Sequence, residues 1–178
     1  MKYKGIEFDA IVATPCCGKS YLCDKYPDKF VDVDEVRLRC KYNVPENITR
    51  RELEETKGDR TFTRKADHKQ YIIDMEKILD KYVAEGKTLI AAPQPEAIDY
   101  LVKNNIKFAF VYQNKYMKEE IKKRMIARGN PSKTIKENID MFDILYRKNI
   151  NENKSVIHYE FGKDEHLEDI IKIFEYKF

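Results

Sequence analysis

The sequence predicts an α/β protein with three layers, in which helices flank a mostly parallel sheet of five strands. Short runs of β-branched and aromatic residues alternate with longer charged segments of helical period, which is typical of strands joined by crossover helices. The apolar runs lack the strict alternation of half-exposed strands, which indicates that both faces of the sheet are covered. With 178 residues and 42% hydrophobic content, the chain is long enough to bury one core. Because no linker interrupts it, residues 1–178 are expected to form a single domain.

The expected strands are the apolar runs at residues 8–13, 30–33, 88–92, 108–112 and 155–161. The expected helices cover residues 19–25, 35–42, 66–85, 95–104, 115–128, 133–149 and 165–176. The clearest helix is 66–85, where apolar residues recur every three or four positions and Gly86 follows as a C-terminal cap. Gly129 and Pro131 end the helix 115–128, because neither residue continues a helix well.

The charges of the chain nearly cancel. Lysine and arginine number 34 and aspartate and glutamate 31, so the formal charge is +3, without the one-signed surface of a dedicated nucleic-acid binder. No apolar stretch is long enough for a membrane helix, and Glu7 and Asp9 interrupt the first one, which argues against a secretory signal. The four cysteines, including the adjacent Cys16 and Cys17, lack metal-site spacing and are expected to be free thiols. A cytoplasmic protein is therefore expected.

Two segments depart from the alternation of strands and helices. Residues 43–65 are polar and carry both signs of charge, which indicates a surface excursion, and loops of this length are often functional. Residues 115–149 contain ten Lys or Arg residues against five acidic residues. They fit either a pair of solvated amphipathic helices or a basic segment that faces an anionic ligand.

The strongest local signal is ATPCCGKS over residues 13–20, which fits the phosphate-loop pattern A/G-x-x-x-x-G-K-S/T. It lies between an apolar run and a helical segment, as such a loop requires. Gly18 lets the backbone approach a phosphate, Lys19 supplies a mobile cation for the β- and γ-phosphates, and Ser20 offers a hydroxyl to Mg²⁺. Ala13 replaces the usual first glycine and would be strained if that position needed a positive φ. The expected ATP-binding residues of this loop are Thr14, Pro15, Cys16, Cys17, Gly18, Lys19 and Ser20.

A second signal is VDVDEVR over residues 31–37, at the end of the second expected strand. The two-residue spacing places Asp32 and Asp34 on the same side of that end, where open parallel sheets bind ligands. In the functional interpretation, Asp32 holds Mg²⁺ through water, Asp34 orients or deprotonates an acceptor, and Arg37 pairs with an acceptor phosphate. Alternatively, Asp34 is only the N-cap of a helix that begins near Glu35.

The third expected strand ends at Ala92 and Pro93 without an acidic residue. Motor ATPases and GTPases depend on a metal-binding aspartate at this place. The sequence therefore argues against those classes and gives more weight to Asp32.

A third signal is the pair Arg124 and Arg128. Because they are four residues apart, a helix places them on one face. Two guanidinium groups there can bind the oxygens of a transferring phosphoryl group, over which charge spreads in the transition state. An exposed basic helix is the other interpretation.

Together these residues resemble the P-loop nucleotide kinases, in the branch that contains nucleoside monophosphate kinases and small nucleotide kinases predicted in phages. The resemblance rests on the Walker A loop 13–20, the Asp32-x-Asp34 strand end, the third strand with Pro93, the strand 108–112 and the segment 122–130. It implies a P-loop fold and transfer of the ATP γ-phosphoryl group, with Mg²⁺ as cofactor. The acceptor would be a small phosphorylated molecule, in the first place a nucleoside or deoxynucleoside monophosphate.

The resemblance also implies roles for individual residues. The segment 115–149 would be a helical lid that closes over the nucleotide and excludes water. The excursion 43–65 would bind the acceptor. The catalytic residues would be Lys19, Asp34, Arg124 and Arg128, with both arginines also binding ATP, and the acceptor-binding residues would be Asp34, Arg37, Arg60 and Arg64.

Alternatives stay open. Asp34-x-x-Arg37 is similar to the pattern of polynucleotide 5′-hydroxyl kinases, in which the aspartate is the base, and only this alternative involves nucleic acid. Asp32-x-Asp34 is also similar to shikimate kinase, although residues 91–94 replace its glycine-rich turn. A third alternative is a non-catalytic ATP-binding switch, which Ala13 and the missing later aspartate would suggest. Such a switch would bind ATP without consuming it.

Overall fold

The fold is taken from a computed structural model that describes residues 1–55, 62–63, 67–140, 142 and 155–175. Five strands form a parallel sheet in the order β4-β5-β3-β6-β7. This confirms the expected α/β class and the five-stranded parallel sheet. The strands are β3 (Ala10–Ala13), β4 (Phe30–Asp32), β5 (Thr88–Ala91), β6 (Phe108–Gln113) and β7 (Ile157–Phe161).

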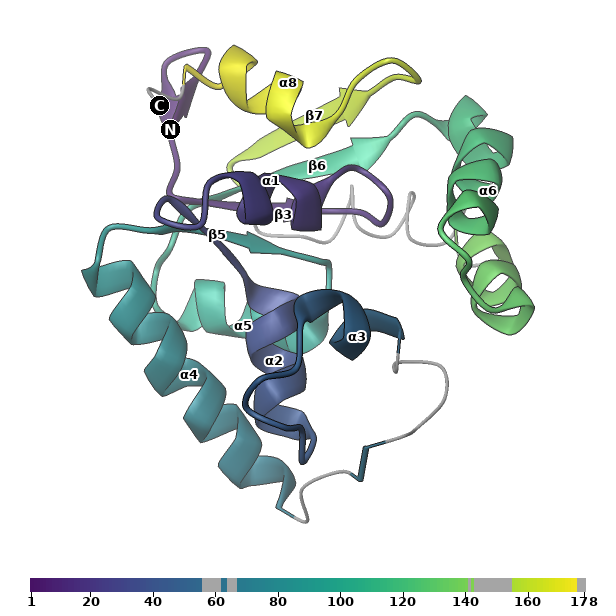
Figure 1. Cartoon of the computed structure of the whole chain (residues 1–178). Helices are drawn as coiled ribbons and strands as arrows, with labels where there is room; N and C mark the ends of the chain where they lie inside the picture. Colours follow the sequence, from purple (N-terminus) through teal and green to yellow (C-terminus); the bar gives the residue numbers. More distant parts are fainter. Residues whose placement is uncertain (56–61, 64–66, 141, 143–154, 176–178) are drawn as a thin grey trace.

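Helices cover both faces of this sheet (Figure 1). One face carries α2 (Val33–Lys41), α4 (His68–Ala84) and α5 (Pro95–Lys103). The other face carries α1 (Lys19–Lys25) and α8 (Leu167–Ile173). Beyond the end of β6, the 3-10 turn η1 (Lys115–Met117) leads into α6 (Lys118–Ala127), and residues 132–140 are helical again. None of the helices in these described ranges combines the length and hydropathy needed to cross a membrane.

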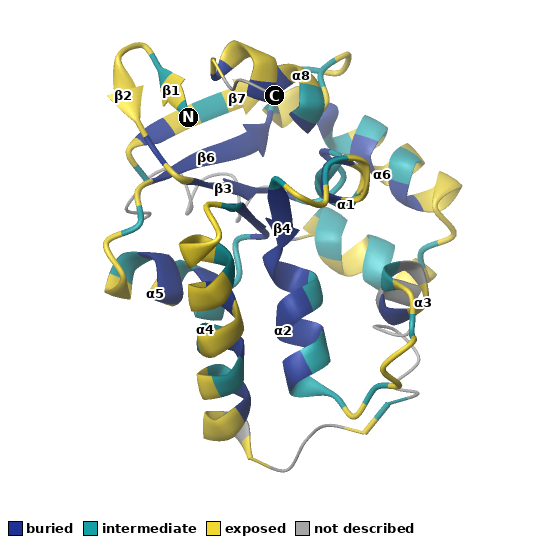
Figure 2. Ribbon diagram, turned by 60° about the vertical axis from the view of Figure 1, so that its left-hand side comes forward, coloured by how far each residue is buried: buried dark blue, intermediate teal, exposed yellow. Residues whose placement is uncertain are grey.

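The alternation of side chains along β3 explains the two cores. Ile11 and Ala13 pack beneath α1 and α8, whereas Ala10 and Val12 pack beneath α2, α4 and α5. Successive residues of a strand point to opposite faces, so one short strand supplies both layers. Figure 2 shows the resulting buried residues along β3 and β6.

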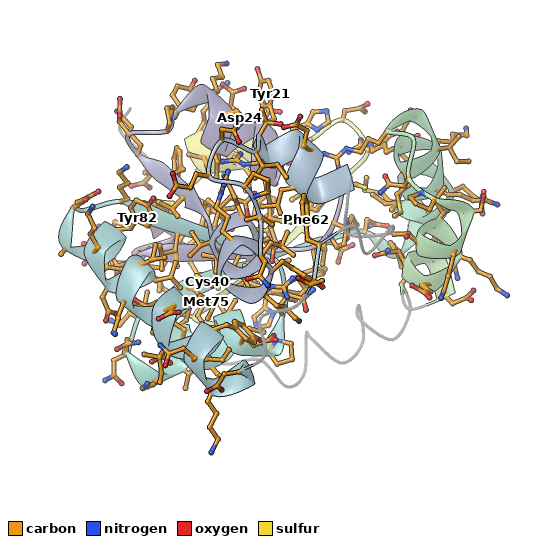
Figure 3. The ribbon with its side chains drawn as sticks, turned by 60° about the horizontal axis from the view of Figure 1, so that its bottom comes forward. Tyr21, Asp24, Cys40, Phe62, Met75 and Tyr82 are labelled. Carbon is orange, nitrogen blue, oxygen red and sulfur yellow. The ribbon has the colours of Figure 1, made fainter. Side chains whose placement is uncertain are left out.

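The core between the sheet and α2, α4 and α5 contains aromatic side chains together with small and flexible ones. Cys40 of α2 and Met75 of α4 lie in the same core cluster and close together in Figure 3. Asp67 caps α4 by accepting from the N–H groups of Lys69 and Gln70 at 2.8 and 3.2 Å. The long helix expected over 66–85 is therefore confirmed, with an N-terminal cap that satisfies its first backbone donors.

The sequence did not predict the antiparallel hairpin of β1 (Lys2–Tyr3) and β2 (Ile6–Glu7). Its turn places Lys4 and Gly5 at φ values of 48° and 82°. Strands of two residues are too short to give a periodic signal. The hairpin packs by the ring of Tyr3, which contacts the rings of Tyr159 and Phe174.

The excursion 43–65 contains a helix, α3 (Arg50–Glu55), which the sequence also did not predict. Its Leu53 is buried, so the expectation of a purely superficial segment is wrong for this part. One apolar residue within six is too little for a helical period to be visible. Within the same excursion, the Asn43 N–H donates to the Thr63 carbonyl at 3.0 Å.

Candidate functional site

A cavity of about 240 Å³ lies where the strands of the sheet end. Four parts of the chain form it: the loop 13–20, the junction of β4 with α2, the segment after β5, and the end of α6 with residues 130–138. The described lining residues are Pro15, Cys16, Gly18, Lys19, Ser20, Asp32, Asp34, Ala92, Gln94, Met125, Arg128, Asn130, Thr134 and Asn138. Most of the predicted site residues therefore meet in one place, although they come from distant parts of the sequence.

The loop 13–20 turns sharply between β3 and α1. Gly18 has a φ of 96° and Cys16 a φ of 63°, whereas Ala13 is not among the residues with positive φ. The strain considered for Ala13 is therefore absent, and the left-handed backbone falls on Cys16. For a residue other than glycine this conformation costs on the order of 1 kcal/mol, so neighbouring groups have to hold it.

Lys19 is half-buried at the start of α1, with its ammonium turned onto the loop. Nζ donates to the carbonyl oxygens of Ala13 at 2.9 Å and Thr14 at 3.0 Å. Burial alone would lower the pKa of this amine, but the negative charge of acidic neighbours, which include the Asp34 and Asp32 carboxylates, outweighs burial and raises the pKa. The amine is thus a fixed positive charge in the cavity wall.

Asp32 ends β4 and is the N-cap of α2. Its Oδ1 accepts from the N–H groups of Asp34 at 2.9 Å and Glu35 at 3.4 Å. The alternative in which Asp34 is the cap is therefore wrong, and the helix begins at Val33. Asp34 lies in the first turn of α2 rather than on the strand, yet both carboxylates line the cavity.

Asp34 and Arg37 form a buried pair with unsatisfied polar atoms. Asp34 Oδ1 is 3.9 Å from Arg37 Nε, and neither atom has a hydrogen-bond partner among the described residues. The two residues are only 8% and 9% exposed. Buried polar atoms normally have partners. Because Asp34 lines the cavity, a ligand with a hydrogen-bond donor can complete this centre.

Two of the predicted acceptor-binding residues lie outside the described residues, namely Arg60 and Arg64. A third, Arg37, is not among the described residues that line the cavity. The structure places its guanidinium against Asp34, where it neutralises a carboxylate. This placement does not support the expected direct contact of Arg37 with an acceptor phosphate.

The two arginines of the expected lid occupy different positions. Arg128 lines the cavity, and its Nη1 is 4.0 Å from the Cys16 sulfur. Arg124 donates to the carbonyl oxygens of Cys16 at 3.2 Å and Lys163 at 2.6 Å, and its Nε donates to Glu120 at 3.1 Å. Arg128 therefore faces the cavity, whereas Arg124 does not line it and binds the loop backbone at Cys16.

Comparison with known proteins adds little. No family model matches the chain, and no curated protein sequence matches it. A solved structure of an uncharacterized protein from Eubacterium ventriosum is similar at 18% identity and a TM-score of 0.47, with 93% of this chain and 96% of that chain covered.

Four polar lining residues were not predicted: Gln94, Asn130, Thr134 and Asn138. Gln94 follows β5 at the edge where the parallel strands end, and that position could have indicated it. Thr134 and Asn138 are four residues apart on one helical face, and the Asn138 amide donates to the Thr134 carbonyl at 2.8 Å.

Ser20 and Asp32 are the predicted metal ligands, and both line the cavity. Mg²⁺ is usually bound by one or two carboxylates and keeps its other positions for substrate phosphates and water. A hydroxyl and a carboxylate on one wall fit this requirement. The described residues form no cluster of three or more His, Cys, Asp or Glu side chains that could hold an ion by themselves.

Arg50 links helix α3 to the end of the 13–20 loop. Its Nε is 2.7 Å from Glu35 Oε2, and its Nη1 is 2.8 Å from both the Asp24 carboxylate and the Ser20 carbonyl. Figure 3 shows Asp24 on α1 beside this helix. Arg50 thus anchors the excursion 43–65, which is expected to bind an acceptor, next to Ser20, which is expected to bind Mg²⁺.

This anchor predicts a pH dependence of stability. Burial alone would raise the pKa of Glu35, but hydrogen bonds and charge from Arg50 and Arg39 outweigh burial and lower the pKa below its ordinary value of 4.5. A lowered carboxyl pKa stabilises the fold above the unfolded pKa, and this contribution is lost as the pH falls through the folded pKa. We expect the urea concentration at half-unfolding to decrease as the pH is lowered below 4.5. In Arg50→Gln it should decrease less steeply with pH. If the urea midpoint of Arg50→Gln depends on pH as steeply as that of the wild type, the Arg50–Glu35 ion pair is not the cause of this pH dependence.

Proposed function

We propose that the protein transfers the γ-phosphoryl group of ATP to a nucleotide acceptor, and that its sheet and 13–20 loop are those of a P-loop kinase. The observation that carries this proposal is the composition of one cavity. Lys19 and Ser20 of a loop with the sequence ATPCCGKS share it with two carboxylates and Arg128. A phosphate-binding cation, metal ligands and acidic groups are the parts that phosphoryl transfer requires.

Phosphoryl transfer depends on positioning and on stabilisation of spread charge. In the proposed complex, Lys19 binds the oxygens of the β- and γ-phosphates, and Arg128 binds the transferring group from the lid side. Ser20 and Asp32 would hold Mg²⁺, which neutralises phosphate charge when bound. Asp34 lies on the acceptor side, where it orients the attacking group.

The nature of that attacking group divides two candidates. A nucleoside monophosphate is the first candidate, because its phosphate oxygen is already an anion and needs only to be held. A hydroxyl acceptor is the second, because the buried Asp34 Oδ1 lacks a donor among the described residues and can take a proton from a hydroxyl. In the second case the reaction would resemble that of 5′-hydroxyl kinases.

A panel of acceptors tests these candidates. The protein is incubated with ATP, Mg²⁺ and, separately, nucleoside monophosphates, deoxynucleoside monophosphates, nucleosides and oligonucleotides with a 5′-hydroxyl end. We expect ADP to form with one acceptor class and only slowly without it. If ATP binds but no acceptor yields a phosphorylated product, the switch becomes the better interpretation.

Arg128→Ala is expected to lower turnover about 10²-fold, because it removes a charge that would face the transferring group. Stability should change little, since the guanidinium makes only a weak contact with the loop, the 4.0 Å approach of Nη1 to the Cys16 sulfur. The matched control is Lys133→Ala, which removes a charge from an exposed position of the same basic segment. Initial rates at saturating ATP measure both. Equal losses in the two variants would mean that only the overall charge of the segment matters.

A further inference from the structure

Hydrogen-bond donors hold the carbonyl groups along most of the 13–20 loop. From residue 13 to residue 18, every carbonyl oxygen accepts at least one hydrogen bond. In loop order the donors are Lys19 Nζ for Ala13 and Thr14, Gln113 Nε2 for Pro15, Arg124 Nη1 for Cys16, the Leu167 N–H for Cys17 and the Leu22 N–H for Gly18.

The middle of the loop is held by donors from outside it. Gln113 is the last residue of β6, Arg124 lies on α6, and Leu167 begins α8. Three elements that are distant in the sequence therefore hold three successive peptide groups.

Holding a carbonyl also fixes the next N–H. Across a trans peptide the C=O and the following N–H point in opposite directions, and no peptide bond in the described ranges is cis. A loop that binds phosphate has to turn N–H groups toward it, because a carbonyl in that place would repel the anion. The positive φ of Cys16, at 63°, makes this part of the loop the one that most needs support.

Gln113 is placed to give that support. It is 4% exposed, and its amide donates to the Pro15 carbonyl. On the same strand, the Val111 carbonyl accepts from the Thr14 N–H at 3.0 Å. Two residues of β6, Val111 and Gln113, thus hydrogen-bond to the successive loop residues Thr14 and Pro15. A buried amide needs such a partner, so a change at this position acts directly on the loop.

Resting on the proposed function, we propose that Gln113 is a positioning residue that fixes the Pro15 peptide group and so sets the affinity of the loop for nucleotide phosphates. Arg124 fixes the Cys16 peptide group in the same way. Gln113 does not line the 240 Å³ cavity, although it lines a smaller pocket behind Thr14 and Pro15. Its link to the cavity is the hydrogen bond to the Pro15 carbonyl. Removal of the Gln113 amide therefore weakens the binding of every ligand that places phosphates on the loop, whichever base that ligand carries.

Gln113→Met tests this proposal, because methionine keeps the length of the side chain and cannot donate. Titration calorimetry measures the Kd of Mg²⁺–ATP and of inorganic tripolyphosphate. Loss of one hydrogen bond is expected to raise both Kd values about fivefold to tenfold, by the same factor. Gln113→Asn, which keeps an amide but is shorter, should move both values in the same direction and serves if the first variant does not fold.

Tyr100→Phe is the matched control. It removes another partly buried hydrogen bond, from the Tyr100 hydroxyl to Asp80 at 2.8 Å, which lies between α4 and α5. It should lower the melting temperature by a few degrees, as is also expected of Gln113→Met, and leave both Kd values unchanged. Unchanged Kd values in folded Gln113→Met, or a change for ATP without one for tripolyphosphate, would overturn the positioning role. Failure of the wild-type protein to bind either ligand would instead overturn the proposed function itself.

Discussion

Lys19→Ala is expected to lower phosphoryl transfer about 10³-fold, at the upper end of the effect of removing one charge-stabilising group. The variant loses the cation that would bind the β- and γ-phosphates. It also loses the donor to the carbonyls of Ala13 and Thr14, so the loop becomes less well ordered for binding. Both effects act on nucleotide turnover, which is measured as ADP formed in the presence of the active acceptor.

Lys25→Ala is the matched control for this variant. It removes a lysine from the same helix, α1, where Lys25 pairs with Glu168 at 2.7 Å on the surface. Such surface pairs contribute little to stability, so activity and melting temperature should both stay close to wild type. Near-wild-type turnover in Lys19→Ala would end the kinase proposal.

Asp34→Asn is also expected to have a large effect, and its size depends on the acceptor. If the acceptor is a hydroxyl, loss of the base should lower turnover by about 10²- to 10⁴-fold. If the acceptor is a phosphate, only orientation is lost and the decrease should be smaller. The Kd of ATP should stay the same in both cases, because the loop and Lys19 are untouched.

Asp32→Asn is the informative partner of that experiment. Asparagine caps helices as well as aspartate does, so α2 should remain stable, while the charge that would hold Mg²⁺ is lost. The Mg²⁺ concentration needed for half-maximal rate should rise in this variant and not in Asp34→Asn. If Asp34→Asn lowers only the melting temperature and keeps turnover per folded molecule, Asp34 serves only as the counter-charge of Arg37.

Sequence reasoning was most successful where the signal is local. The helix α1 has the expected bounds, and the loop before it has the strand and helix that its pattern demands. The order of the strands in the sheet was not predicted, because it depends on long-range pairing. The parallel arrangement followed from the alternation of strands and helices, and the structure confirms it.

The site was predicted in composition but not in arrangement. Spacing placed Arg124 and Arg128 on one helical face, yet only the packing of α6 against the loop decides which one reaches the cavity. The boundary between β4 and α2 similarly depends on which aspartate accepts from the first N–H groups of the helix. Asp32 does so, and the helix therefore begins at Val33. Gln113 had no signal of its own, because an amide at the end of a strand gains its role from a loop about a hundred residues away.

The left-handed cysteine of the loop has a practical consequence. Of the four cysteines, Cys17, Cys23 and Cys40 are buried, whereas Cys16 is partly exposed and lines the cavity. Burial raises the pKa of the Cys17 and Cys23 thiols, which keeps them in the unreactive form. A thiol-directed label therefore has one reachable sulfur, in the space that phosphates would occupy. The rate at which Cys16 is labelled can therefore show whether a ligand occupies the cavity, before any acceptor is known.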